Sequence, residues 1–81
     1  MFIVYILRSL KNSKRYIGQT SKDVFERLHD HNTGSNVWTR HNGPFDVIYF
    51  EEYLNKIDAI RRERFLKSGQ GRKWLDQNNY K

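Results

Sequence analysis

The alternation of apolar and polar segments predicts a β-hairpin at the start of the chain. An unbroken apolar run covers residues 2–7, and a second short run around residues 15–19 follows it. Residues 8–14, between the two runs, are basic and rich in turn formers. Because aromatic and β-branched residues suit strands, the two runs are predicted to pair as antiparallel strands.

Each predicted strand carries one tyrosine, Tyr5 or Tyr16. If these residues pair directly, the turn is centred between Leu10 and Lys11, and both hydroxyls point into one site. The alternative is that both tyrosines are present only because they suit strands.

A helix is predicted from the residues after Thr20 to about Asn32. Thr20 or Ser21 can cap its start, Thr20 and Asp23 have capping-box spacing, and Thr33-Gly34 ends it. Its apolar stripe is formed by Val24, Phe25 and Leu28. Arg27 and His31 lie four residues apart beside that stripe. Both are candidate site residues. The alternative is that Arg27 is a snorkelling side chain and His31 an edge residue with no function.

Residues 33–44 are predicted to form a long polar loop that contains Trp38, Arg40 and His41. These residues suit contact with phosphates and bases, or Trp38 pins the loop to the core. Residues 45–53 are predicted to be a third strand. Four consecutive apolar residues at 47–50 indicate burial on both faces, so helices are expected on both sides of the sheet.

A second long helix is predicted from a cap at Asn55 to Ser68, with Gly69 as its terminator. Glu63 falls in the middle of its apolar stripe. A carboxylate that turns inward is costly unless it is paired or binds a cation. The plain explanation is a pair with Lys67 four residues on; the functional one is a Mg²⁺ site completed by waters and a phosphate oxygen. Residues 72–78 add a further turn or two, and residues 78–81 are expected to fray.

Composition narrows the classes of function. The 81 residues are expected to form one small domain covering residues 1–81, and they include no cysteine, which excludes disulfides and cysteine-based zinc sites. No apolar stretch has the length of a membrane span and no signal segment is present, so a cytoplasmic protein without a membrane partner is expected. Fifteen Lys and Arg against nine Asp and Glu give +6, which favours a nucleic-acid partner.

The sequence resembles the GIY-YIG nuclease domain family over essentially its whole length, and most of all the short stand-alone bacterial members. Residues 3–5 and 16–18 match the two halves of the family name, although Ile3 and Val4 replace its glycine and isoleucine. Residues 26–32 match the arginine helix and residues 59–69 the metal-binding glutamate helix. Asn78 is a possible match to a late asparagine. The resemblance implies an α+β fold with a three-stranded antiparallel sheet flanked by helices.

The resemblance further implies DNA endonuclease activity with a single divalent ion, Mg²⁺ or Mn²⁺. Glu63 is then expected to hold the ion, Arg27 to stabilise the transition state, Tyr5 or Tyr16 to orient or deprotonate water, and His31 to accept or relay a proton. Contacts with the nucleic acid, mainly with its phosphate backbone, are expected from a set of basic residues and one aromatic residue: Lys11, Lys14, Arg15, Trp38, Arg40, Arg61, Arg62 and Lys67.

Two other classes of function remain open on the sequence. One is a nucleic-acid-binding module with weak or no nuclease activity, and the other is a partner-binding domain that uses a sheet edge or the Trp38 segment. The substrate structure, including branched or single-stranded DNA, and the pathway are also open, since repair, mobile elements and defence all use relatives.

Overall fold

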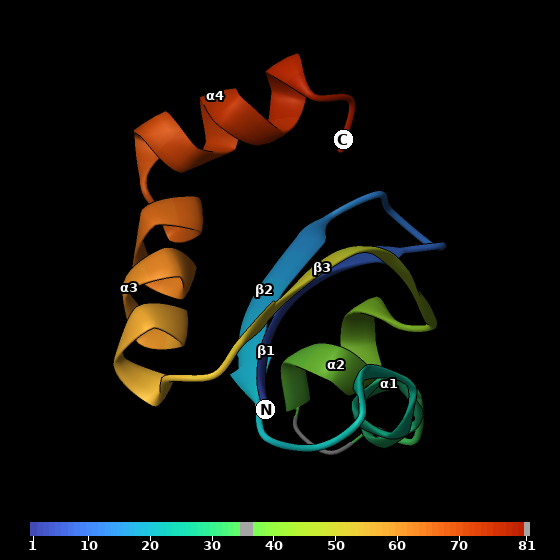
Figure 1. The fold of residues 1–81 in the computed structure, drawn as a ribbon. Helices are drawn as coiled ribbons and strands as arrows, with labels where there is room; N and C mark the ends of the chain where they lie inside the picture. Colours follow the sequence, from blue (N-terminus) through green and yellow to red (C-terminus); the bar gives the residue numbers. More distant parts are fainter. Residues whose placement is uncertain (35–36, 81) are drawn as a thin grey trace.

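Three strands and four helices follow one another along the chain (Figure 1). The computed structural model describes residues 1–34 and 37–80, so Ser35 and Asn36 of the expected loop and Lys81 of the expected frayed end lie outside the described residues. The elements are β1 Phe2–Ser9, β2 Arg15–Thr20, α1 Val24–Asn32, α2 Val37–Asn42, β3 Phe45–Tyr53, α3 Lys56–Lys67 and α4 Gly69–Gln77. None of the helices within these ranges has the length and apolar content needed to cross a bilayer.

The sheet is antiparallel with the strand order β2-β1-β3. This arrangement confirms the predicted hairpin, the third strand and the α+β class with its three-stranded sheet. The central strand is β1, whose residues Val4 to Leu7 are buried on both faces. The expectation that residues 47–50 are buried on both faces is wrong, because β3 is an edge strand and Phe50 is 41% exposed.

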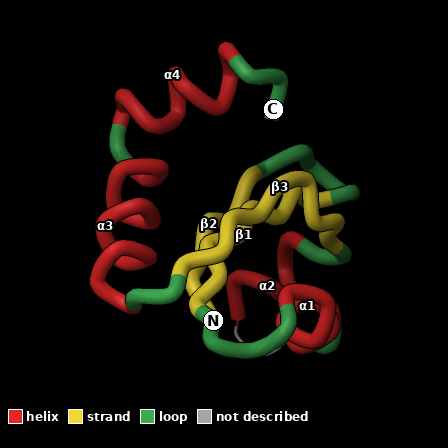
Figure 2. The backbone as a smooth tube through the Cα atoms, viewed as in Figure 1, coloured by secondary structure: helices red, strands yellow, loops and turns green. Residues whose placement is uncertain are grey.

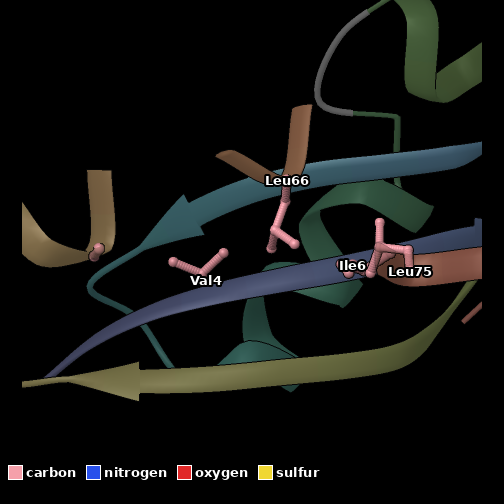
Figure 3. Packing of buried hydrophobic residues seen from close by; sticks show 5 residues of the cluster. Val4, Ile6, Leu66 and Leu75 are labelled. Atoms are coloured by element: carbon pink, nitrogen blue, oxygen red, sulfur yellow. The ribbon is translucent and has the colours of Figure 1, made fainter. Parts of the chain in front are cut away.

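Helices cover both faces of the sheet, as Figure 2 shows, with α1 and α2 on one side and α3 and α4 on the other. Alternate residues of β1 therefore belong to two separate clusters. Val4 and Ile6 pack with Leu66 of α3 and Leu75 of α4 (Figure 3). Tyr5 and Leu7 point to the opposite face, where they pack with Val24 of α1 and Phe45 of β3. The tyrosine of the central strand is thus on the α1 face.

Helix α1 begins later than predicted, because Asp23 rather than Thr20 or Ser21 is its cap. The Asp23 carboxylate accepts the backbone N–H groups of Phe25 and Glu26, at 2.9 and 3.3 Å. The buried residues of α1 are Val24 and His31, while Phe25 is 61% exposed. The two buried residues of α1 are therefore seven positions apart, and the second of them is a histidine. The apolar pattern of the sequence did not reveal that this imidazole is buried.

The segment expected to be a long polar loop contains a helix instead. Residues Val37–Asn42 form α2, which buries Thr39 and Asn42. The Asn42 side chain accepts from Asn12 of the hairpin turn at 2.8 Å and donates to the carbonyl of Trp38 at 2.8 Å. The contact with Asn12 attaches α2 to the turn between β1 and β2.

The chain turns sharply between α3 and α4 at Ser68, which ends one helix and caps the next. Gly69, predicted to end the preceding helix, is instead the first residue of α4, which therefore begins three residues earlier than the predicted turn at residues 72–78. Tyr80 was expected to fray, but its ring lies 4.4 Å from that of Tyr49 and its N–H donates to Leu75 at 2.8 Å.

Gly71 permits the close approach of α3 and α4, because a β-carbon there would lie 1.9 Å from the carbonyl oxygen of Phe65. We expect Gly71→Ala to lower the free energy of unfolding by about 1–3 kcal/mol or more through overpacking. The matched control is Gly69→Ala in the same helix, where a β-carbon meets nothing within 4 Å. This control should raise stability by about 0.4–1 kcal/mol. Urea denaturation of both variants checks the expectation, and equal effects would contradict it.

Candidate active site

Tyr5 and Tyr16 lie on the same face of the hairpin but do not pair directly. Tyr5 is opposite Gly18 and Tyr16 is opposite Leu7, so the predicted pairing of the two tyrosines is wrong by one pair of positions. Because side chains alternate between faces with a period of two, this shift leaves both phenols on the same face. Their ring centroids are 6.3 Å apart and the rings are stacked.

Gly18 provides the space that Tyr5 occupies. A β-carbon on Gly18 would lie 2.5 Å from the Tyr5 hydroxyl oxygen and 3.1 Å from Cε1 of Tyr16. The ring of Tyr5 therefore crosses over β2 at the one residue of that strand without a side chain. This close approach explains why the YIG half of the motif contains a glycine in this chain.

His31 of α1 meets Tyr5 in the core. It is fully buried, and its Nε2 lies 2.9 Å from the Tyr5 hydroxyl. The imidazole also packs against the ring of Tyr16, with centroids 4.6 Å apart. Its Nδ1 is buried and has no hydrogen-bond partner among the described residues. His31 is therefore more than an edge residue, because its ring joins both phenols.

Arg27 lies one helical turn before His31 and interacts with the same hydroxyl. Its guanidinium approaches the Tyr5 oxygen closely enough to favour the ionised phenol. It also lies 3.5 Å from the Asp30 carboxylate, which Lys22 contacts at 3.1 Å. About a third of the Arg27 side chain remains exposed. One guanidinium is thus oriented by a buried phenol and a surface carboxylate while part of it faces solvent.

The pKa values of the buried pair are displaced in opposite directions. Burial raises the pKa of Tyr5, the nearby Arg27 guanidinium opposes this rise, and the charges of Tyr16 and Glu63 add to it. Burial lowers the pKa of His31, and the charge of Arg27 lowers it further. Both groups are then neutral near pH 7. The Tyr5 hydroxyl and Nε2 of His31 are therefore joined by a hydrogen bond between two neutral groups, whose direction depends on the imidazole tautomer.

Glu63 comes from α3, on the opposite face of the sheet, and its charge still acts on the Tyr5 phenol. The carboxylate is paired with Lys67 at 3.3 Å, and 22% of the Glu63 side chain is exposed. The plain i,i+4 explanation is therefore present in the structure. It does not account for the position of the group, because such a pair is worth only about 0.2–0.5 kcal/mol on a helix surface.

The lone carboxylate of Glu63 fits a hard divalent ion that is held mostly by water and substrate, rather than an ion enclosed by several protein ligands. The described residues contain no group of three His, Cys, Asp or Glu side chains able to hold a metal. A single partly exposed carboxylate is compatible with Mg²⁺, which commonly takes one or two carboxylates and completes its shell with water and substrate phosphates. Lys67, the partner of this carboxylate, is itself 55% exposed.

Trp38 and Arg62, two of the predicted nucleic-acid contacts, have structural partners. The ring of Trp38 stacks on Phe45 at 5.6 Å and meets Tyr16 at 5.4 Å, so this residue attaches α2 to the core. Arg62 forms a bidentate pair with Glu51 of β3, at 2.9 and 3.0 Å. Its guanidinium also lies 4.6 Å from the ring of Trp74. The geometry favours a packing role for both side chains.

The other predicted contacts differ in accessibility, since the Lys67 side chain is 55% exposed and that of Arg15 only 19%. Lys14 and Arg40 are exposed. Arg15 forms an ion pair with Asp76 at 2.9 Å and donates to the carbonyl of Tyr80 at 3.0 Å. Arg15 and Lys67 line one cleft together with Tyr16. Asn78, the possible match to a late asparagine, caps the end of α4, and its side chain donates to the Trp74 carbonyl.

Three basic residues that the sequence analysis did not select also line clefts beside the site. Arg72 shares a cleft with Tyr16, and Lys22 and Lys56 share another with Arg27. The positive charge of the chain was visible in the sequence, but the folding that brings these three residues to β2 was not. Among these three residues, Lys56 alone had a position that the sequence marked, because it directly follows Asn55, the predicted cap of the second long helix.

The three-stranded antiparallel sheet flanked by helices is consistent with the fold of a GIY-YIG catalytic domain. The family model for the GIY-YIG catalytic domain matches residues 1–80. The chain is also 38% identical over 65 residues to a UPF0213 protein of Oceanobacillus iheyensis, covering 79% of this chain and 73% of the relative. A UPF0213 protein of Clostridium perfringens is 38% identical over 68 residues, covering 83% and 71%. No solved structure is significantly similar to this chain. The chain belongs to the GIY-YIG catalytic domain family, which implies nuclease-type activity.

The buried imidazole predicts how stability depends on pH. His31 has a lowered pKa when folded, so between this value and about 6.5 the unfolded chain binds more protons. The free energy of unfolding should therefore fall as the pH is lowered from 7.5 to 5.5. His31→Gln, which keeps a polar group beside Tyr5 but does not titrate, should flatten this dependence in urea denaturation.

The matched control for this experiment is His29→Gln, which removes an exposed histidine from the same helix. A pH dependence that persists in His31→Gln and disappears in His29→Gln would contradict the assignment to the buried ring.

Proposed function

We propose that this protein is a divalent-metal-dependent DNA endonuclease that hydrolyses phosphodiester bonds at the site formed by Tyr5, Tyr16, Arg27, His31 and Glu63. The observation that carries the proposal is the meeting of the first four side chains around one hydroxyl. Tyr5 contacts His31 at 2.9 Å and lies against Arg27, and Tyr16 packs on His31. A binding module has no need for this arrangement, or for a carboxylate whose charge would repel phosphate.

Glu63 is the residue that would hold the ion, Mg²⁺ or Mn²⁺. When bound, the ion supplies positive charge to the scissile phosphate and to the leaving oxygen. The carboxylate is suited to this because it is partly exposed and its present partner, Lys67, is a mobile surface cation. Replacement of Lys67 by a divalent ion at the Glu63 carboxylate also removes the repulsion between Glu63 and an incoming polyanion.

Arg27 is the group that stabilises negative charge on the phosphate. Its guanidinium has five N–H donors in a fixed plane, and the contacts with Tyr5 and Asp30 use only part of them. The remaining donors face solvent, where they are available to a non-bridging oxygen as charge builds in the transition state.

The two tyrosines have different roles in the proposed reaction. Tyr16 lines an open cleft and is the phenol that meets substrate and orients the attacking water. Tyr5 is 1% exposed, holds Arg27 in place and shares its proton with His31. Burial and the charge of Arg27 lower the pKa of His31, so the imidazole is neutral near pH 7 and would relay a proton from the phenol rather than retain it.

Loss of the carboxylate should abolish cleavage and leave binding intact. We expect Glu63→Gln to lower the rate of nicking with Mg²⁺ or Mn²⁺ by about 10³-fold, because the ion loses its protein ligand. Affinity for DNA should be equal or higher, since a negative charge is removed. The control is Glu52→Gln, an exposed carboxylate on β3. A wild-type protein that binds DNA but cuts no branched, single-stranded or duplex substrate would establish the alternative, a binding module.

Arg27→Ala separates catalysis from binding. We expect the cleavage rate to fall by about 10²–10³-fold, the usual loss when one transition-state donor is removed. Affinity should change far less, because a single phosphate contact is one of several. Single-turnover rates and anisotropy titrations on the same DNA give the two quantities. Equal losses in rate and affinity would reduce Arg27 to a phosphate anchor.

A further inference from the structure

Two clefts with basic linings flank the candidate site along β2. The first, of about 460 Å³, is lined by Arg15, Tyr16, Lys67 and Arg72 among others. The second, of about 300 Å³, is lined at the other end of the strand by Thr20, Lys22, Arg27 and Lys56 among others. Each cleft therefore contains three cationic side chains, and a site residue lines each of them: Tyr16 in the first, and Arg27, one of the three cations, in the second.

The clefts follow the direction of a single edge strand. The first adjoins residues 15–17 and the second residues 19–20 of β2, which pairs only with β1. At about 3.3 Å per residue, Tyr16 and Thr20 are about 13 Å apart along the strand. That span accommodates a few successive phosphates of one nucleic-acid strand, whose charges are spaced about 3.4 Å apart along a duplex axis.

Most cations of the two clefts are available to phosphates at small cost. Lys67 is paired with Glu63, Lys22 with Asp30 and Arg15 with Asp76, at 3.3, 3.1 and 2.9 Å. The two lysines are more than half exposed, and surface pairs of this kind are worth about 0–1 kcal/mol each, so exchange of their carboxylates for a phosphate is easy. Arg15 is only 19% exposed and also donates to the carbonyl of Tyr80, so it is held more firmly. Lys56 and Arg72 are exposed side chains that add to the positive charge at the two ends.

We propose that the two clefts are the arms of one phosphate track. The track holds a nucleic-acid strand on both sides of the candidate site and presents the phosphate between the arms to Tyr16, Arg27 and Glu63. This inference rests on the proposed function and adds Lys22, Lys56 and Arg72 to its binding residues. It also requires that the cleaved bond lies inside a strand, because both flanks are gripped.

Charge reversal at each end tests the track. The probe is a fluorescent 15-nucleotide single-stranded DNA, titrated without metal so that no cleavage occurs, over a series of salt concentrations. We expect Lys56→Glu and Arg72→Glu each to weaken binding by about tenfold. Each should also reduce the slope of log K against log salt by about 0.7, the value for one lost contact on a single strand. In the double variant, the two fold-losses should multiply, since the residues line different clefts.

The charge-matched control is Lys73→Glu, which alters an exposed residue of α4 that lines neither cleft. It should weaken binding by less than about threefold, through long-range charge alone. An equal loss of affinity in Lys73→Glu would contradict the track, because binding would then depend on overall charge. A loss of affinity in only one of the two cleft variants would contradict a path that uses both clefts. Because these titrations contain no metal, they are independent of cleavage. If the affinities follow the predicted pattern but the protein cuts no DNA when metal is added, the phosphate track is supported and the proposed nuclease function is rejected.

Discussion

The fold and the candidate site both depend on the close passage of Tyr5 over Gly18. Tyr5 lies in the central strand, so its backbone is fixed by hydrogen bonding to neighbours on both sides. Its ring needs the space that a side chain at position 18 would fill. Once the ring lies there, its hydroxyl reaches His31 and Arg27 from a single helix. One missing β-carbon thus determines where a phenol, an imidazole and a guanidinium meet.

Much of the fold could be predicted because the apolar runs have the period and length of their elements. The bounds of β3 and the cap of α3 at Asn55 are as the sequence indicated. The hairpin register was not predictable, because Ser9 closes the turn through its hydroxyl and Ser13 takes a left-handed φ of 62° that serine rarely adopts. The six-residue α2 is too short to give a periodic signal, and its contacts are with distant residues.

The candidate site was predictable in membership but not in arrangement. Helical spacing placed Arg27 and His31 on one side of α1, and the position of Glu63 within an apolar stripe marked it as unusual. Burial of His31 was not visible, since it follows from the phase of α1 on the sheet. The role of Arg62 was also hidden, because its partners Glu51 and Trp74 lie on other elements. Charge alone does not distinguish an arginine that binds phosphate from one that holds a helix in place.

The pairing of Arg62 explains how α3 can offer Glu63 to solvent. Neighbouring helix residues point about 100° apart, so a side chain fixed at position 62 sets the direction of the next one. Arg62 is fixed by two hydrogen bonds to Glu51, which also accepts from Tyr49 and from Tyr53, the latter at 2.6 Å. This network neutralises one carboxylate completely. Glu63 is paired with a single exposed lysine, Lys67, so the two acids differ in how firmly their cationic partners are held.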